Sequence, residues 1–494
     1  MALSSLSLGN ALLLPSAVLF VYATSYAFYN IFLHPLRRYP GPLLMRATRM
    51  GYHWRAMRGT LPFDMLPLHK KYGPVVRIAP GELAFADPAA WKDIMGHRGG
   101  GLEMEKSLQF YRPLADMPAD IISAPREEHG LLRRTMAHGF SDRGLREQQP
   151  MIKQYIDLFL KRLRERSDGG KKAVDIGKWY NFTTFDVIGD LAFGESFGCL
   201  DSSDYHPWVK AIFQLARAGT IFQMAAHYPL VMKLLLALIP KRFMKEREHH
   251  ESLVRIKLQK RMDIKGGRPD LIEGLLIKAD EWGLTLDKLQ ANSAILIIGG
   301  SETTATLLSG VTYLLLRNPT ALKKLTEEIR GNFKSEAEID LTSVSALPYL
   351  LACLDEGLRM YPPVPTGLPR VVPKGGANIC GNYVAEGNIV AVHQWAMYHN
   401  DSNFKDPFAF HPERWLGDPA FASDRKDAFQ PFHLGARNCL GRNLAYIEMR
   451  LILVRTLWNF DMRIAEDSLD WMSKQRIFNM WEKGPLNVYL TPVR

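Results

Sequence analysis

The residues best suited to chemistry lie in the segment 432–441, Phe-His-Leu-Gly-Ala-Arg-Asn-Cys-Leu-Gly, whose reactive member is Cys439. Gly435 and Gly441 bracket this cysteine and carry no Cβ, so the backbone can fold tightly and approach a large flat group. The apolar spacing of residues 442–460 predicts a helix directly after the loop. Unpaired N–H groups and the helix dipole at that start favour thiolate over thiol, so we expect Cys439 to bind a metal.

A lone cysteine in apolar surroundings is more often a small buried hydrophobe than a ligand. Here Phe432, Gly435, Arg437, Cys439 and Gly441 match Phe-x-x-Gly-x-Arg-x-Cys-x-Gly, which resembles the haem-binding loop of the cytochrome P-450 superfamily. The resemblance implies that Cys439 is the axial thiolate of haem b, that Phe432 covers the sulfur side of the haem, and that Arg437 meets a propionate. A thiolate ligand pushes electron density onto iron and favours O–O cleavage.

The longest helical pattern covers residues 286–317, and its middle reads Ile-Ile-Gly-Gly-Ser-Glu-Thr-Thr-Ala. Two glycines in mid-helix cost about 1 kcal/mol each, so either a helix kink or the close approach of a cofactor and O₂ must favour them. The run from Gly299 to Thr304 resembles the oxygen-activating helix of the same superfamily. The resemblance implies that Gly300 lies against the cofactor, that Thr303 serves oxygen activation by a hydrogen bond, and that Glu302 passes protons from solvent.

Basic residues at three further positions have counterparts in the superfamily. His129 and Arg133 lie one turn apart on one face of a helix expected over 127–140, an arrangement that is often only solvated charge. The superfamily commonly has Trp at the first of these positions, so His129 departs from its pattern. The resemblance implies that His129, Arg133 and Arg370 contact the haem propionates.

A structural network is also implied. Glu356 and Arg359 lie at i and i+3 on a predicted helix and can form an ion pair, although Glu-x-x-Arg alone is a weak motif. Arg414 lies between that helix and the cysteine loop, and it matches the third member of a buried Glu/Arg/Arg network. In the superfamily this network orders the loop that carries the cysteine.

The chain has 494 residues, and its 62 Lys and Arg against 51 Asp and Glu give a net charge of +11. This excess fits an anionic membrane surface or an acidic redox protein better than nucleic acid, because the cations are scattered rather than striped with aromatics. The four cysteines show no zinc spacing and no disulfide framework, so a reducing compartment is expected. We find no repeat and no linker after residue 45, which indicates one large domain.

Residues 8–33 are uncharged and mostly apolar, long enough for a membrane-spanning helix, and a charged signal-peptide n-region is missing. Arg37 and Arg38 follow and should stay cytosolic. We therefore expect residues 1–33 to be a single-pass anchor in the endoplasmic reticulum and residues 34–494 to be a cytosolic catalytic domain. The sequons at Asn181 and Asn400 would then be unmodified. Residues 39–42, Tyr-Pro-Gly-Pro, predict a rigid elbow between the two parts.

Elsewhere, residues 75–78 and 83–85 predict a β-hairpin, and residues 151–166, 179–194 and 207–218 predict helices. The apolar run 229–240 is bounded by prolines and trailed by cations. It is too short to span a bilayer, and it fits either a core helix or a segment that lies in the membrane interface.

Together the motifs imply a mainly α fold with small β sheets, the cytochrome P-450 fold, behind a transmembrane helix. The implied activity is monooxygenation of a hydrophobic small molecule with O₂, as in fungal secondary metabolism. Electrons come from NADPH through a cytochrome P-450 reductase, with cytochrome b5 as a further donor. Two alternatives remain open: a haem-thiolate isomerase or dehydratase that takes no electrons, and a non-catalytic haem-binding membrane protein. The substrate cannot be deduced from the sequence.

Overall fold

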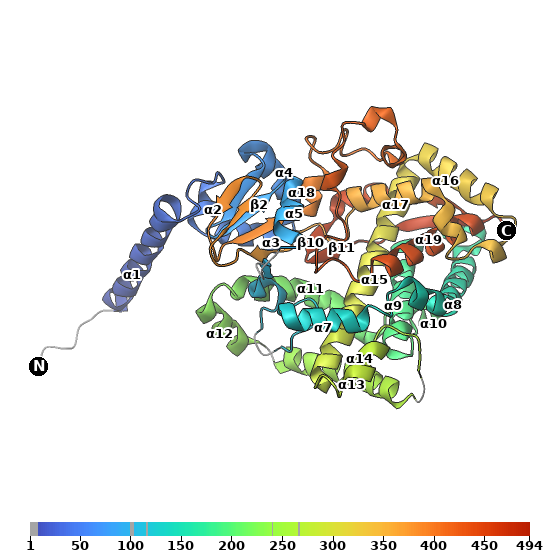
Figure 1. The fold of residues 1–494 in the computed structure, drawn as a ribbon, viewed down its shortest axis with the longest axis horizontal. Helices are drawn as coiled ribbons and strands as arrows, with labels where there is room; N and C mark the ends of the chain where they lie inside the picture. Colours follow the sequence, from blue (N-terminus) through green and yellow to red (C-terminus); the bar gives the residue numbers. More distant parts are fainter. Residues whose placement is uncertain (1–7, 99–102, 115–116, 240, 265–266) are drawn as a thin grey trace, which may run out of the picture.

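The computed structural model describes residues 8–98, 103–114, 117–239, 241–264 and 267–494. Helices dominate and the sheets are small, so the predicted mainly α class is confirmed (Figure 1). The helices before the longest one are α1 (Leu8–Phe28), α2 (Leu43–Ala47), α3 (Met50–Met57), α4 (Leu61–Tyr72), α5 (Ala89–Met95), α6 (Leu108–Tyr111), α7 (Arg126–Met136), α8 (Asp142–Ser167), α9 (Ile176–Phe193), α10 (Cys199–Ser202), α11 (Pro207–Ala225), α12 (Pro229–Leu238), α13 (Lys241–Asp263) and α14 (Glu273–Lys278). The later helices are α15 (Leu286–Arg317), α16 (Pro319–Asn332), α17 (Pro348–Met360), α18 (Gln394–Tyr398) and α19 (Arg442–Asn459).

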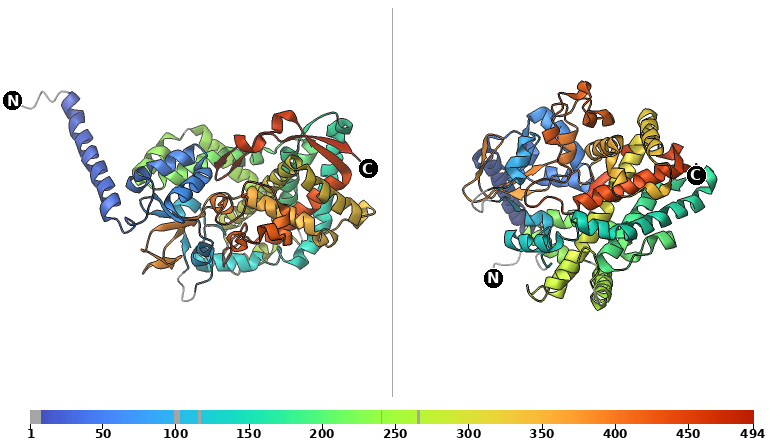
Figure 2. Two further views of the ribbon diagram at one scale, coloured as in Figure 1. Left: turned by 90° about the horizontal axis from the view of Figure 1, so that it is seen from above. Right: turned by 45° about the vertical axis from the view of Figure 1, so that its right-hand side comes forward.

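Helix α15 runs through the centre of the domain and packs against α9, α16, α17 and α19 (Figures 1 and 2). Its observed bounds are those predicted, and the Thr285 hydroxyl caps it by accepting a hydrogen bond from the Lys288 N–H. Most of its side chains are buried inside the domain, so its length and apolar composition fit a core helix. Residues on one part of the same helix line a cavity.

Several predicted helix bounds were wrong, and among them α9 begins at Ile176 rather than at residue 179 and α11 ends at Ala225 rather than at residue 218. Helix α8 begins at Asp142 rather than at residue 151, because the Ser141 hydroxyl caps it and Pro150 is accommodated inside the helix. Helix α7 ends at Met136 rather than at residue 140. The helix after the cysteine loop was predicted to within one residue, since its apolar periodicity is strong.

The predicted hairpin is confirmed: β1 (Val75–Ala79) pairs antiparallel with β2 (Glu82–Phe85). Strand β2 also pairs parallel with β8 (Ile389–Val392), and β5 (Arg370–Val371) and β3 (Glu105–Lys106) complete a five-stranded sheet. In this sheet Lys106 pairs with Arg370. The smaller sheets join β4 (Val174–Asp175), β12 (Asn487–Pro492) and β9 (Phe460–Ile464), β6 (Ala377–Ile379) and β7 (Asn382–Val384), and β10 (Arg476–Phe478) and β11 (Met480–Glu482).

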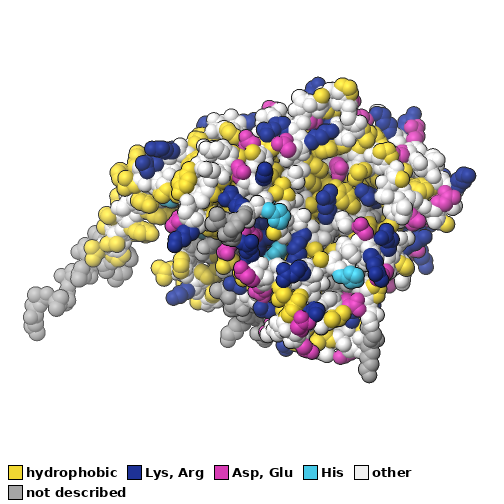
Figure 3. Space-filling model, in the orientation of Figure 1, with side chains coloured by type: hydrophobic (Ala, Val, Ile, Leu, Met, Phe, Trp, Pro, Cys, Tyr) yellow, Lys and Arg dark blue, Asp and Glu magenta, His cyan; other side chains and the backbone are white. Residues whose placement is uncertain are grey.

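Helix α1 projects away from the domain and is continued by a π-helical turn, Tyr29–Leu33 (Figures 1 and 2). The segment Leu14–Leu33 is long and apolar enough to cross a membrane and is almost entirely exposed. The end of this segment nevertheless touches the domain, because the Asn30 amide donates to the Ala47 carbonyl oxygen and the Asn30 carbonyl accepts from Arg77. Exposed hydrophobic side chains cover the projecting helix in Figure 3. This arrangement is consistent with membrane anchoring.

Helix α12 falls in the run that fitted either core or membrane interface. None of its residues is buried, and Leu230, Leu234 and Leu238 are 81%, 61% and 70% exposed. The core reading is therefore wrong. The helix lies at the end of the domain from which α1 projects, and the Tyr228 ring before it contacts His53 of α3 (Figures 1 and 2). Pro240, the end of the predicted run, lies outside the described residues.

Candidate functional site

The cysteine loop is held in place by its own backbone. The Cys439 N–H donates to the Phe432 carbonyl oxygen at 2.9 Å, and the Asn438 N–H donates to the Gly435 carbonyl oxygen at 3.2 Å. Gly435 has φ +80°, and a Cβ there would lie 1.9 Å from the Met95 carbonyl oxygen. The loop therefore requires glycine at this position, as the sequence suggested on conformational grounds.

Cys439 lies inside the domain, but its surface is exposed because it faces a cavity. Burial raises the pKa of its thiol above the usual value. The Gly441 N–H and the Arg133 guanidinium act in the opposite direction, but their effect is smaller. The backbone N–H before the helix therefore favours thiolate, as expected, but burial outweighs this effect on the pKa of Cys439. Helix α19 begins only at Arg442, so the sulfur meets one backbone N–H rather than a full helix terminus. A thiolate in this position needs a cation beside it, as a bound metal ion would supply.

The cavity over Cys439 has a volume of about 520 Å³ and is enclosed by α7, α15, α19, the cysteine loop and the segment after α17. Eight of the twelve candidate residues line it, although they come from four separate parts of the chain: His129, Arg133, Gly300, Thr303, Arg370, Phe432, Arg437 and Cys439. Glu302, Glu356, Arg359 and Arg414 do not line it.

One wall of the cavity is the glycine-containing turn of α15. A Cβ on Gly299 would meet nothing within 4 Å, so this position opens into the cavity. A Cβ on Gly300 would lie 2.6 Å from Cδ1 of Ile188, so the close packing of α9 on α15 already demands glycine there. The Thr303 hydroxyl faces the same cavity and donates to the Gly299 carbonyl oxygen at 2.7 Å.

Glu302 is next to Thr303 in sequence, but its carboxylate has other partners. It forms a buried ion pair with Lys483 and accepts a hydrogen bond from the Thr306 hydroxyl at 3.2 Å. Lys483 also donates to Thr306 at 2.5 Å. Successive side chains on a helix point about 100° apart. The adjacent acid and hydroxyl therefore do not form a direct relay in this arrangement.

A cluster of cations lies at one end of the cavity. Its lining members are Lys106, Arg133, Arg370 and Arg437, and His129 lies among them. Burial, together with Arg437 and the other cations, lowers the pKa of His129 to about 3, so this imidazole is neutral. Burial and the neighbouring Arg370 also hold the pKa of Lys106 well below its usual value. So many cations in one place favour an anionic ligand.

The hydrogen bonds of this cluster are incomplete. Arg437 pairs with Glu103 and donates to the Ala124 carbonyl oxygen at 2.8 Å. Within the described residues, Arg370 Nε, His433 Nε2 and Tyr111 Oη are buried and have no partner. Unpaired buried donors are rare in folded proteins, so several beside one cavity indicate that a ligand supplies acceptors.

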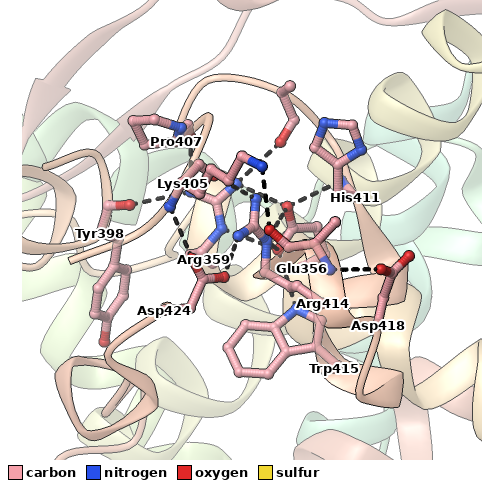
Figure 4. A network of polar contacts seen from close by, with 12 residues as sticks. Glu356, Arg359, Tyr398, Lys405, Pro407, His411, Arg414, Trp415, Asp418 and Asp424 are labelled. Atoms are coloured by element: carbon pink, nitrogen blue, oxygen red, sulfur yellow. Dashed lines mark hydrogen bonds and ion pairs between the residues drawn. The ribbon is translucent and has the colours of Figure 1, made fainter. Parts of the chain in front are cut away.

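Glu356, Arg359 and Arg414 are all buried and lie at the centre of the network drawn in Figure 4. Arg359 lies 2.7 Å from its carboxylate and Arg414 lies 3.0 Å away. Although burial alone would raise it, these two guanidinium groups hold the pKa of Glu356 below its usual value. Arg359 also donates to the carbonyl oxygens of Tyr398 and Pro407. The network thus ties α17 to the segment before the cysteine loop.

Three residues of the site region were missed from the sequence. Glu448 lies on α19 and lines the cavity, Lys483 pairs with Glu302, and Asn479 lies at the tip of the β10–β11 hairpin. Glu448 lies two helical turns beyond Gly441, so the helical period could have placed it on the cavity face. Lys483 and Asn479 come close through long-range packing, for which the sequence carried no signal.

Comparison with known proteins identifies the family. The family description "Cytochrome P450" matches residues 40–487. A cytochrome P450 monooxygenase of Penicillium brasilianum is 47% identical over 478 residues, which cover 97% of both chains. The trichothecene C-15 hydroxylase of Fusarium sporotrichioides is 44% identical and covers 94% of both chains. Averantin hydroxylase of Dothistroma septosporum is 44% identical over 96% of this chain and 90% of its own. With a match over most of its length and relatives that are oxygen-incorporating oxidoreductases, the chain belongs to the cytochrome P450 family.

Proposed function

We propose that this cytochrome P450 monooxygenase is a single-pass protein of the endoplasmic reticulum membrane, with residues 34–494 on the cytosolic side, and that it oxidises a hydrophobic secondary metabolite. The observation that carries the proposal is a cysteine inside the domain, Cys439, which is exposed to a cavity closed on another side by Gly299 and Thr303. The relatives named as hydroxylases of trichothecene and averantin support a tailoring step in secondary metabolism.

The residues present fit haem b. Cys439 supplies the thiolate, and Phe432 lies beside it in the lining. The unpaired donors of Arg370, His433 and Tyr111 and the surplus of cations suit two carboxylates, which the haem propionates provide. Bound through a thiolate, haem supplies the redox chemistry that activates O₂. In our proposal Arg133, Arg370 and Arg437 hold the propionates, and neutral His129 serves as a hydrogen-bond donor.

The chain's own part in the reaction is proton delivery at Thr303. Its hydroxyl lies on the cavity wall and can hold a proton there. Lys483, the ion-pair partner of Glu302, lines a second cavity of about 260 Å³. The exposed residues Arg217 and Glu482 line the same cavity. This cavity offers water a route to the ion pair. We infer that the Glu302 carboxylate leaves Lys483 before it passes a proton to Thr303.

Electron supply follows from the family. We propose that NADPH–cytochrome P450 reductase delivers two electrons, that cytochrome b5 is a second donor, and that the net charge of +11 favours such acidic partners. Asn181 is 4% exposed and its amide contacts the Tyr205 hydroxyl, which supports the absence of glycosylation there.

Replacement of Cys439 tests the proposal. Cys439→Ala should abolish the absorbance band that carbon monoxide gives with reduced haem-thiolate proteins, because the only thiol that lines the cavity within the described residues is lost. Cys380→Ala removes a half-buried thiol elsewhere and should leave the band intact. Persistence of the band in Cys439→Ala would contradict the ligand assignment.

NADPH consumption then separates the candidate functions. With added reductase, a monooxygenase consumes NADPH and O₂ in step with product, whereas a haem-thiolate isomerase or dehydratase forms product without consuming either. A protein that gives the carbon monoxide band but forms no product, with or without NADPH consumption, would be a haem-binding protein only.

A further inference from the structure

A third cavity, of about 60 Å³, adjoins the large one and shares Phe110, Gln223, Thr366 and Asn479 with it. We call this smaller cavity the polar annex. Its walls come from α3, α4, α6, α11, the end of β8 and the β10–β11 hairpin. It is far smaller than the large cavity, so it has room for a small substituent of a ligand rather than for the whole ligand. Its polar lining residues include His53, Gln109, Gln223, Thr366, His393 and Asn479.

Asn479 is the residue most clearly built for contact with a ligand. It is the single residue between β10 and β11, where Phe478 pairs with Met480, and its φ of +61° is a conformation that asparagine tolerates better than most residues. The amide lies against Gly219 of α11, where a Cβ would lie 3.4 Å from the Asn479 Nδ2. The described residues form no hydrogen bond with this side chain, and it lines both cavities.

Two further side chains at the annex are incompletely paired. The Gln223 amide nitrogen donates to the Phe110 carbonyl oxygen at 3.0 Å, which fixes the amide group. His393 is 2% exposed, and its Nδ1 accepts a hydrogen bond from the Gly367 N–H at 3.0 Å. Because burial lowers the pKa of His393 to about 3, the ring is neutral and its hydrogen is on Nε2. Among the described residues Nε2 has no acceptor.

The annex contains polar groups but no charge. No Lys, Arg, Asp or Glu of the described residues lines it. Burial lowers the pKa of His53 to about 4 and that of His227 to about 3, so these histidines are also neutral at physiological pH. A carboxylate would be buried there without a counter-ion, which is unfavourable. A neutral oxygen, which accepts one or two hydrogen bonds, suits this lining.

Away from the cation cluster, the large cavity offers a substrate few polar groups for hydrogen bonds. Its substrate-side walls are apolar side chains, including Ile122, Ile188, Leu296, Val364 and Leu368. A polar group placed against them would lose its hydration without compensation. We propose that the annex binds a neutral oxygen function of the substrate, a ketone, lactone or hydroxyl, through the Asn479 amide, with Gln223 and His393 beside it. The substrate class is then an already oxygenated polycyclic compound rather than a hydrocarbon.

This inference rests on the proposed function, because the oxygen contact serves to orient the carbon skeleton over the cofactor. It also places the protein in a reaction order. An earlier oxidation or a polyketide-forming reaction must introduce the first oxygen, and this enzyme then oxidises a carbon at a distance from it. A single neutral hydrogen bond supplies roughly a threefold to tenfold preference in affinity.

The test uses matched pairs of probes on the haem-loaded protein: nootkatone with its parent hydrocarbon valencene, and polycyclic ketones with their deoxygenated parents. Affinity is measured by displacement of imidazole from the haem, which reports binding whether or not turnover follows. We expect the wild type to bind the ketones about threefold to tenfold more tightly than the hydrocarbons. Asn479→Gly, which suits the positive φ, should abolish this preference and leave the hydrocarbon affinity unchanged.

Equal affinity for both members of every pair in the wild type, or an unchanged preference in Asn479→Gly, would overturn the inference. Absence of binding by the whole panel would also overturn it. Failure of the proposed function is distinguishable, because the carbon monoxide band of the reduced protein would then be missing in the wild type.

Discussion

The buried carboxyl group of Glu448 shows how a single residue can couple stability to pH. It lies on α19 beside the cavity, and neither of its oxygens has a partner that meets hydrogen-bond geometry among the described residues. Burial raises its pKa to about 8, and the hydroxyl of Thr304 on α15 lowers it slightly. Protonation of Glu448 therefore avoids a buried negative charge between α19 and α15.

The sign of the resulting pH dependence follows from proton uptake. Between the ordinary value of 4.5 and about 8 the native state holds a proton that the unfolded state has released, so stability falls as pH rises across this window. Each pKa unit corresponds to roughly 1.4 kcal/mol, so the total is on the order of a few kcal/mol. Glu448→Gln should therefore raise the thermal midpoint at pH 8.5 much more than at pH 5. Glu327→Gln, on the exposed face of α16, should change neither value. An equal effect of Glu448→Gln at both pH values would contradict this account.

Thr303 allows a test of proton delivery that leaves cofactor binding intact. Thr303→Ala removes a hydroxyl that the cavity exposes, while Cys439, Arg133, Arg370 and Arg437 remain. We expect the carbon monoxide band to persist and NADPH oxidation to continue while product falls roughly tenfold to a hundredfold and hydrogen peroxide rises. Ser301→Ala is the matched control, because its hydroxyl also bonds the carbonyl oxygen four residues earlier but is buried away from the cavity. Unchanged coupling of NADPH to product in Thr303→Ala would exclude the relay.

At the scale of elements, the strongly periodic helices could be predicted from the sequence, whereas the long-range contacts between elements could not. The bounds of α15 follow from an unbroken apolar period and a Thr285 cap, and those of α19 from a similar period. Strand β3 has only two residues, and Lys106 reaches the cavity through its pairing with Arg370. Residues that far apart in sequence meet only because β5 and β3 share a sheet. The ion pair of Glu302 was not predictable for a related reason, since its partner Lys483 comes from the C-terminal part of the chain.

Helix α12 carries a prediction about the membrane. Its exposed leucines lie at the end of the domain from which α1 projects, so we expect this helix to lie in the membrane interface. In a protein without residues 1–28, Leu230→Glu with Leu234→Glu should reduce binding to phospholipid vesicles at least tenfold, measured by flotation. Ile277→Glu changes an equally exposed apolar side chain on α14 and is the control. Equal loss of binding in all variants would indicate a non-specific charge effect.

At the scale of the whole molecule, the anchor and the domain are not fully separate. The sequence placed their boundary after residue 33, and the exposed span Leu14–Leu33 fits that division in most respects. Asn30 is the exception, because it is buried against α2 and accepts a hydrogen bond from the fully buried Arg77 of β1. Leu36 is also buried in the core around the five-stranded sheet. Hydropathy could locate the apolar span, but it carried no information on this docking contact.

Truncation at two positions measures what the docked segment contributes. A protein that begins at Tyr29 keeps Asn30 and Leu36, whereas one that begins at Arg37 loses both and leaves Arg77 with one unpaired buried donor. Such a donor costs roughly 1 to 3 kcal/mol, which should lower the thermal midpoint of the shorter protein by at least about 2 °C. Both proteins should still give the carbon monoxide band, because no lining residue of the large cavity precedes Lys106 within the described residues. Equal midpoints would show that the docking contact contributes nothing to the domain, and loss of the band in either would place part of the catalytic fold inside the anchor.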